Sequence, residues 1–171
     1  MGDIGENQPQ RRCLDWIIVS GTCHYAKDRS AFKTYRGVGK SVGNFILKDQ
    51  TIFVAGVGTV ELRVRSSKEE GSPDRVLVME NVLHTPSAIC NGFNWAVYRK
   101  MNGGHVNLGL EFNGSDSDGR PLWCGQPCVG LQKLVLAGNP QGESSLEEGG
   151  HYCLSIYVSE DVLSAIQAAA A

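Results

Sequence analysis

The stretch of ten residues from Trp16 to Tyr25 constrains the fold most strongly. It reads WIIVSGTCHY, an apolar run with β-branched side chains that stops abruptly at Ser20-Gly21 and continues in small and polar residues. A continuous apolar run of this length is typical of a strand buried on both faces, and Ser-Gly is a turn signal. We therefore predict a buried strand over 14–20 that delivers a polar loop into the interior of the protein.

The rest of the chain favours an all-β fold. Short apolar segments alternate with turn signals, and 21 glycines are scattered between them. The clearest alternation lies in 51–65, where Val60, Leu62 and Val64 are expected to face inward. Strands are predicted at 14–20, 45–47, 51–65, 75–83, 105–112, 121–124, 131–137 and 151–158. Helical structure is predicted only as one turn at 27–32, a short helix at 93–101 and a C-terminal helix capped by Ser159. This pattern predicts a closed β-barrel with one or two short helices.

Length and composition fit one domain. Residues 1–12 are polar and are predicted to be a disordered lead-in, 13–158 to form the barrel, and 159–171 to form a C-terminal helix or tail. The net charge of -2 argues against a nucleic-acid partner, and the apolar runs are too short to cross a membrane. The lead-in lacks the apolar core of a secretory signal, and the six cysteines are expected as thiols, so the predicted location is cytoplasmic.

Three segments resemble the protease domain of Copia-type retrotransposon polyproteins, in the same order and with similar gaps. They are WIIVSG at 16–21, GVGTV at 56–60 and NVLHTP at 81–86, which match Trp-Ile-x-Asp-Ser-Gly, Gly-x-Gly-Thr-Val and Asn-Val-Leu-His-x-Pro. Residues 24–32 and 87–91 are similar more specifically to stand-alone fungal relatives of that domain. The resemblance covers about residues 14–92. It implies a retropepsin-like barrel that works as a homodimer, each subunit giving one Asp to a shared cleft.

Val19 stands where the resemblance places the catalytic Asp. Two neighbouring carboxylates share a proton and activate a water molecule, and a valine side chain can do neither. Asp15 lies four residues earlier, roughly 13 Å back along an extended strand, and nothing in the sequence brings Asp28 to the dyad. Aspartic peptidase activity is therefore not expected. Whether the valine reflects natural loss or an engineered change stays open.

The other motifs in the sequence argue against a metal site, a bound cofactor and a covalent nucleophile. Cys124 and Cys128 are separated by three residues rather than two, and no second pair completes a zinc site. Cys23 and His24 are adjacent on an extended segment, so their side chains point apart and do not form a Cys-His nucleophile. The GVGKS sequence at 37–41 lacks the full spacing of a phosphate-binding loop.

The candidate site is the loop that replaces the catalytic one. We predict that Val19, Ser20, Gly21, His24 and Tyr25 line a cleft, with His24 and Tyr25 as candidate proton or hydrogen-bond donors. The simpler alternative for these two side chains is a polar loop that satisfies its own backbone.

The first functional hypothesis is that this cleft binds a hydrophobic small molecule. The former protease cleft would then serve as a cofactor-independent cyclase or isomerase of fungal secondary metabolism, acting by orientation. The alternatives are a pseudoprotease that binds a peptide by β-addition, and an inactivated remnant of a retrotransposon protease. The expected partners are thus a hydrophobic small molecule or a peptide, with a homodimer and a monomer both left open.

Overall fold

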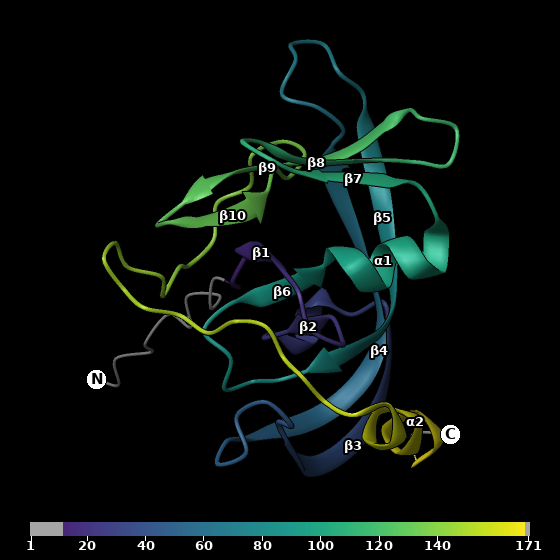
Figure 1. Cartoon of the computed structure of the whole chain (residues 1–171), viewed down its shortest axis with the longest axis vertical. Helices are drawn as coiled ribbons and strands as arrows, with labels where there is room; N and C mark the ends of the chain where they lie inside the picture. Colours follow the sequence, from purple (N-terminus) through teal and green to yellow (C-terminus); the bar gives the residue numbers. More distant parts are fainter. Residues whose placement is uncertain (1–11, 170–171) are drawn as a thin grey trace, which may run out of the picture.

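Ten strands of one sheet and two short helices make up the computed structural model, which describes residues 12–169 (Figure 1). The lead-in predicted for 1–12 therefore lies, except for Arg12, outside the described residues. The strands are β1 (Trp16–Val19), β2 (Tyr25–Ala26), β3 (Thr34–Gly43), β4 (Thr51–Arg65), β5 (Asp74–His84), β6 (Asn91–Asn94), β7 (His105–Leu108), β8 (Phe112–Ser115), β9 (Pro121–Cys128) and β10 (Leu131–Leu134). The helices are α1 (Trp95–Asn102), α2 (Glu160–Ala169) and a single 3-10 turn at Arg29–Ala31.

The strands follow the order β3-β4-β5-β2-β6-β1-β10-β9-β8-β7. Neighbouring strands are antiparallel except for the parallel pairs β1–β6 and β2–β5. β1 thus lies in the middle of the sheet between β6 and β10, and all four of its residues are buried. This position confirms the buried strand predicted over 14–20, although the observed strand is shorter, Trp16–Val19.

The all-β prediction is confirmed, but the sheet is open rather than closed. β3 and β7 lie at its two ends, and within the described residues no ladder joins them. The sheet bends enough for β4 to meet the residues that follow β10: Val64 forms an isolated bridge with Leu136, and the Arg65 N–H donates to the Val135 carbonyl (2.9 Å). One bridge is too little pairing to close a barrel.

The long β4–β5 hairpin follows the predicted alternation, whereas β3 was not predicted. Val60 and Val64 are buried and Leu62 is half-buried, while Glu61 and Arg63 are exposed. The strand expected at 45–47 is instead part of the turn between β3 and β4. β3 is a mostly exposed edge strand with three glycines, so backbone pairing with β4, rather than side-chain burial, holds it in place.

Other expected elements also differ in their limits, and the strand predicted at 131–137 ends at Leu134 as β10. The strand predicted at 105–112 is split into β7 and β8 by a turn, and the one at 121–124 extends to residue 128 as β9. Residues 151–158 are extended but form only one isolated bridge, at Ile156, instead of a full strand. α2 follows this segment and lies beside β3, at the opposite end of the molecule from β7–β9 (Figure 1).

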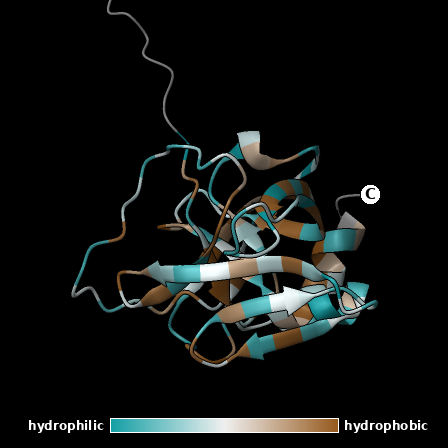
Figure 2. Cartoon of the chain, turned by 90° about the horizontal axis from the view of Figure 1, so that it is seen from above, coloured by the Kyte–Doolittle hydropathy of each residue, from teal (hydrophilic) through white to brown (hydrophobic). Residues whose placement is uncertain are grey.

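Two clusters of buried apolar side chains form the core. The first lies around Val54, Val57 and Leu83 and includes Val158 and Ile166 from the C-terminal part of the chain. The second contains Trp16, Leu77, Phe93 and Trp123. Figure 2 shows hydrophobic residues concentrated near the centre of the molecule and hydrophilic stretches in the long loop at the left of the view.

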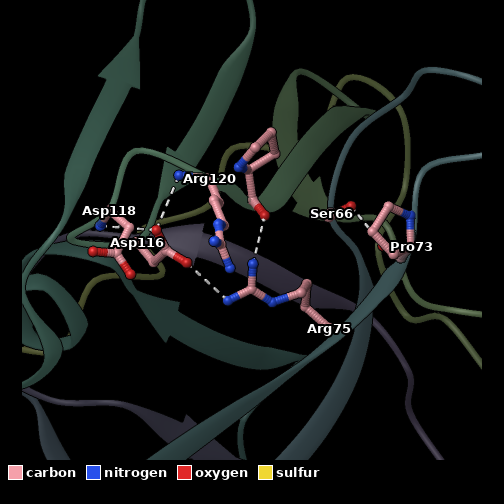
Figure 3. Close-up of polar contacts among 7 residues, drawn as sticks. Ser66, Pro73, Arg75, Asp116, Asp118 and Arg120 are labelled. Carbon is pink, nitrogen blue, oxygen red and sulfur yellow. Dashed lines mark hydrogen bonds and ion pairs between the residues drawn. The ribbon is translucent and has the colours of Figure 1, made fainter.

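Arg75 of β5 holds the turn between β8 and β9 (Figure 3). Its guanidinium donates to the Asp116 carboxylate (3.0 Å) and to the Pro121 carbonyl (3.0 Å). The other oxygen of Asp116 accepts the backbone N–H groups of Asp118 (3.0 Å) and Arg120 (2.9 Å), which closes the turn. The Arg120 N–H and the Arg75 guanidinium hold the pKa of Asp116 below its ordinary value.

Candidate functional site

Val19 ends β1 inside the sheet, beside Asn94 of β6. Its side chain is buried and belongs to the first core cluster. The two carboxylates considered as substitutes for a catalytic Asp are engaged elsewhere. Asp15 faces the Lys133 ammonium of β10 (3.7 Å), and Asp28 accepts the Cys13 N–H (2.8 Å). The end of β1 therefore carries a buried apolar side chain, and both carboxylates have partners elsewhere.

The loop after β1 carries a left-handed turn at Gly21. Its φ is +100°, and a Cβ atom there would collide with the carbonyl oxygen of Ile156. Only glycine combines this backbone conformation with such a close approach. Gly21 thus brings the loop against the C-terminal segment, with which it forms an isolated parallel bridge at Ile156.

Thr22 fastens the loop to the C-terminal segment through both its backbone and its side chain. Its N–H donates to the Ile156 carbonyl (2.9 Å). Its hydroxyl donates to the Val158 carbonyl (2.8 Å) and accepts the Val158 N–H (2.9 Å). Ser20, which is exposed, adds a contact between its backbone N–H and the Ser155 hydroxyl (3.2 Å). The loop is therefore covered by the chain's own residues 155–158.

His24 is buried, and its hydrogen bond determines its tautomer. Its Nδ1 accepts the Asn94 N–H (2.9 Å), so in the neutral ring the proton is on Nε2. Burial lowers the pKa of His24 to about 4, which keeps the ring neutral at physiological pH. The ring stacks on Phe93, with centroids 5.8 Å apart. His24 can therefore donate a hydrogen bond from Nε2 but is a poor base near pH 7.

The side chain of Tyr25 is buried in the interior of the protein. It lies in β2, beside Leu83 of β5 and Gly92 of β6. Its hydroxyl donates to the Leu154 carbonyl (2.6 Å), and burial raises the pKa of the phenol. This hydroxyl already serves as the anchor of the C-terminal segment, and its proton stays on the phenol at physiological pH.

A groove of about 670 Å³ lies beside this loop. Its walls come from residues 21–24, from Phe45 in the β3–β4 turn, from Glu80 and Asn81 of β5, from Val158, and from α1 and α2. The helix residues that line it are Ala96, Val97, Lys100, Met101, Glu160, Leu163, Ser164 and Gln167. Asn94 caps α1 by accepting the Ala96 and Val97 N–H groups (both 3.1 Å). The same residue therefore orients His24 and starts the helix that forms one wall.

The structure brings together only some of the predicted site residues. Gly21 and His24 line the groove, whereas Val19, Ser20 and Tyr25 lie outside its lining. Tyr25 instead borders a separate hollow of about 250 Å³, which residues 153–156 of the C-terminal segment also line. Sequence reasoning missed the roles of Thr22 and of the helix walls, because only the fold brings them to this loop.

The thiols and the metal-binding residue types were the other candidates for reactive groups. Burial raises the pKa of Cys23 to about 12, so its thiol is not a nucleophile at neutral pH. The structure contains no disulfide between the six cysteines, all of which it describes. Among residues 12–169, no three His, Cys, Asp or Glu side chains gather as metal ligands would. In the same range, no helix is both long and apolar enough to span a membrane.

The fold and the comparisons with known proteins agree on the class of the chain. Its mostly antiparallel sheet is open, but it bends so that β4 meets residues 135–136, which brings it part of the way toward a barrel. Residues 16–102, just over half of the chain, match the family described as "Pol polyprotein, beta-barrel domain". The chain therefore belongs to this family. Comparison with curated proteins and with solved structures finds no match.

Proposed function

We propose that this Pol-derived domain is a non-proteolytic binding protein related to Copia-type proteases and their stand-alone fungal relatives, and that it binds a hydrophobic small molecule. One observation carries the proposal: a groove of about 670 Å³ lies next to a β1 end that carries Val19. This volume falls within the range of small-molecule sites, roughly 300–1,000 Å³.

The lining of the groove suits an amphipathic ligand. Apolar side chains from Phe45, Val97 and Leu163 offer contact area to a hydrophobic body. The buried His24, whose Nε2 carries the proton, offers one directed hydrogen-bond donor for a carbonyl or hydroxyl oxygen. We extend the proposal to cofactor-independent cyclisation or isomerisation in secondary metabolism. In that reaction the groove would orient the chain of the substrate and His24 would stabilise a developing negative charge on its oxygen.

A thermal-shift screen of lipophilic metabolites tests the groove. A ligand at 100 times its Kd stabilises the protein by about 2.7 kcal/mol, which is about 5–10 °C for a chain of this length. Ala96→Trp fills the groove from α1 and should abolish the shift. Ala165→Trp, an exposed position of α2 outside the groove lining, is the matched control and should retain it. If no compound shifts the wild-type chain, or if Ala96→Trp responds like Ala165→Trp, the small-molecule proposal fails.

Peptide binding is the second candidate, because an extended segment already lies against the loop. Residues 154–158 accept hydrogen bonds from Thr22 and Tyr25 as an added strand would. Since the same segment covers the loop that the resemblance assigns to the subunit cleft, we propose a monomer. Light scattering that gave a dimer mass would contradict this state.

The third candidate, an inactivated protease copy, has a direct test. Val19→Asp restores the carboxylate that the resemblance expects at the end of β1. Cleavage of peptides by this variant at mildly acid pH would favour an inactivated protease. We expect no cleavage, because residues 155–158 cover the loop.

A further inference from the structure

We infer that residues 152–158 are a tethered ligand. They occupy in cis a channel between the 20–22 loop and the β3–β4 turn, and this channel binds an extended peptide of the same apolar pattern from another molecule once the segment is released. The inference rests on the peptide-binding candidate above, and it adds the site, the pattern of the peptide and the way access is controlled.

The backbone of the segment is bound on both sides. The carbonyls of Ile156 and Val158 accept from Thr22 of the loop (2.9 and 2.8 Å). The intervening carbonyl, that of Tyr157, accepts the Phe45 N–H of the β3–β4 turn (3.0 Å). Successive carbonyls of an extended chain point to opposite sides, so this alternation places the segment between two walls. Because these hydrogen bonds are made to backbone atoms, any extended peptide could form them, whatever its side chains.

The side chains of the segment supply the selectivity. Val158 is fully buried and Ile156 nearly so (0% and 8% exposed), and both belong to the first core cluster. Leu154 packs against the same cluster and is half-buried, whereas Cys153 is exposed. The channel should therefore select a peptide with apolar residues at alternate positions and tolerate polar residues between them.

Several features distinguish this occupant from an integral strand. Within the described residues its only bridge is the one between Gly21 and Ile156, and the preceding residues 147–151 are all exposed. The segment also borders two hollows: Val158 lines the groove of about 670 Å³, and residues 153–156 line the hollow of about 250 Å³. The walls also lie within the family-matched residues 16–102, whereas the occupant lies outside them. The matched part of the chain thus builds a channel that its C-terminal segment then fills.

A cleavable form of the full chain tests this inference. A specific protease recognition sequence is inserted between Gly149 and Gly150, which are both exposed. Cutting converts the tether, together with α2 and its buried Ile166, into a separable fragment without deleting any residue. A fluorescent peptide of residues 150–160, with Cys153→Ser to prevent oxidation, is then added to the cut and uncut chains. Its fluorescence anisotropy measures binding.

We expect the peptide to bind the cut chain at least about tenfold more tightly than the uncut one, because the tether competes at high effective concentration. Placing Asp at position 156 of the peptide should weaken binding at least about tenfold, since a charge would enter the core. In the cut chain, Thr22→Val keeps the side-chain shape but removes the hydroxyl contacts, and should weaken binding about tenfold. Thr34→Val, on the exposed edge strand, is the control and should leave binding unchanged.

The alternative outcomes separate the inference from the function on which it rests. If cut and uncut chains bind the peptide equally, peptides bind elsewhere, and the tethered-ligand inference is wrong while peptide binding stands. If the fragment leaves and the peptide binds neither the cut nor the uncut chain, the tethered-ligand inference and the peptide-binding function are both wrong. If the fragment never exchanges, or if the circular dichroism of the sheet is lost as it leaves, the segment is an integral strand and the inference is overturned.

Discussion

The two halves of the chain differ in how they are built. Residues 16–102 contain the longest strand, β4 with 15 residues, which forms long ladders with β3 and β5. Residues 103–169 contain four strands of at most eight residues, a long irregular segment and α2. The first half matches the Pol polyprotein β-barrel family, and the second half lies outside that match. The first half supplies the 21–24 loop, the β3–β4 turn and α1, and the second half adds residues 155–158 and α2 to the same site.

Phe93 should give the largest effect, because it joins the two halves. It is fully buried, and its ring packs on Trp123 of β9 and on His24, with centroids 5.2 and 5.8 Å away. Phe93→Ala should lower the free energy of unfolding by about 4 kcal/mol in urea denaturation. Phe53→Ala, at a half-exposed aromatic position, should cost less than about 1 kcal/mol. Equal losses would show that the two halves do not share a core at Phe93.

Gly21 tests the contact between the loop and the C-terminal segment. Gly21→Ala adds a strained φ and a collision with the Ile156 carbonyl, so we expect a loss of about 3 kcal/mol. Gly39→Ala is the control, because Gly39 also has a positive φ (+65°) but open space around it, and it should cost about 1 kcal/mol. The difference between the two losses of unfolding free energy measures the cost of the collision with the Ile156 carbonyl. Similar losses would mean that the approach is not tight.

The pH dependence of stability tests the burial of His24. The unfolded chain protonates His24 below its ordinary pKa of 6.5, whereas the folded chain does so only below about 4. Between these values the unfolded state binds more protons, so stability is full above pH 6.5 and falls as the pH falls, by about 3 kcal/mol at pH 4. His24→Gln should flatten this slope in urea denaturations at several pH values. An unchanged slope would contradict the buried, neutral ring.

Arg75 should give the smallest effect, although it also links the two halves. It pairs with Asp116 across the surface, and both side chains are partly exposed. Exposed ion pairs contribute little to stability, because water and salt screen them. Arg75→Ala should therefore shift the melting temperature less than Phe93→Ala or Gly21→Ala. A loss as large as that of Gly21→Ala would show that surface pairing, rather than the core and the loop, holds the halves together.

The same contrast explains how much of the structure the sequence predicts. β1 and the β4–β5 hairpin can be predicted because a local sequence pattern indicates which of their side chains are buried. In β1 this pattern is an apolar run, and in β4 it is the alternation of Val60, Leu62 and Val64. β3 cannot be predicted in this way, because an exposed edge strand with three glycines has no such pattern. For these elements, local burial determines what can be predicted.

The site is less predictable, because distant residues complete it. The alternation of Leu154, Ile156 and Val158 indicates an extended segment but not its neighbours, and the hydroxyl of Thr22 meets residues 134 and 136 positions away. His24 was predicted as a donor, and its Nδ1 contact with Asn94 leaves the proton on Nε2. The segment that binds Tyr25 and Thr22 could be found only in the fold.

Amide hydrogen exchange tests the central claim, that the chain's own C-terminal segment fills the channel. The Thr22 and Phe45 N–H groups both donate to this segment. In the uncut chain both should be protected. After cutting at Gly149-Gly150 and removing the fragment, both should exchange at least about tenfold faster, while the amides of β4 and β5 keep their protection. Unchanged protection at Thr22 and Phe45, or loss of protection throughout β4 and β5, would contradict the account.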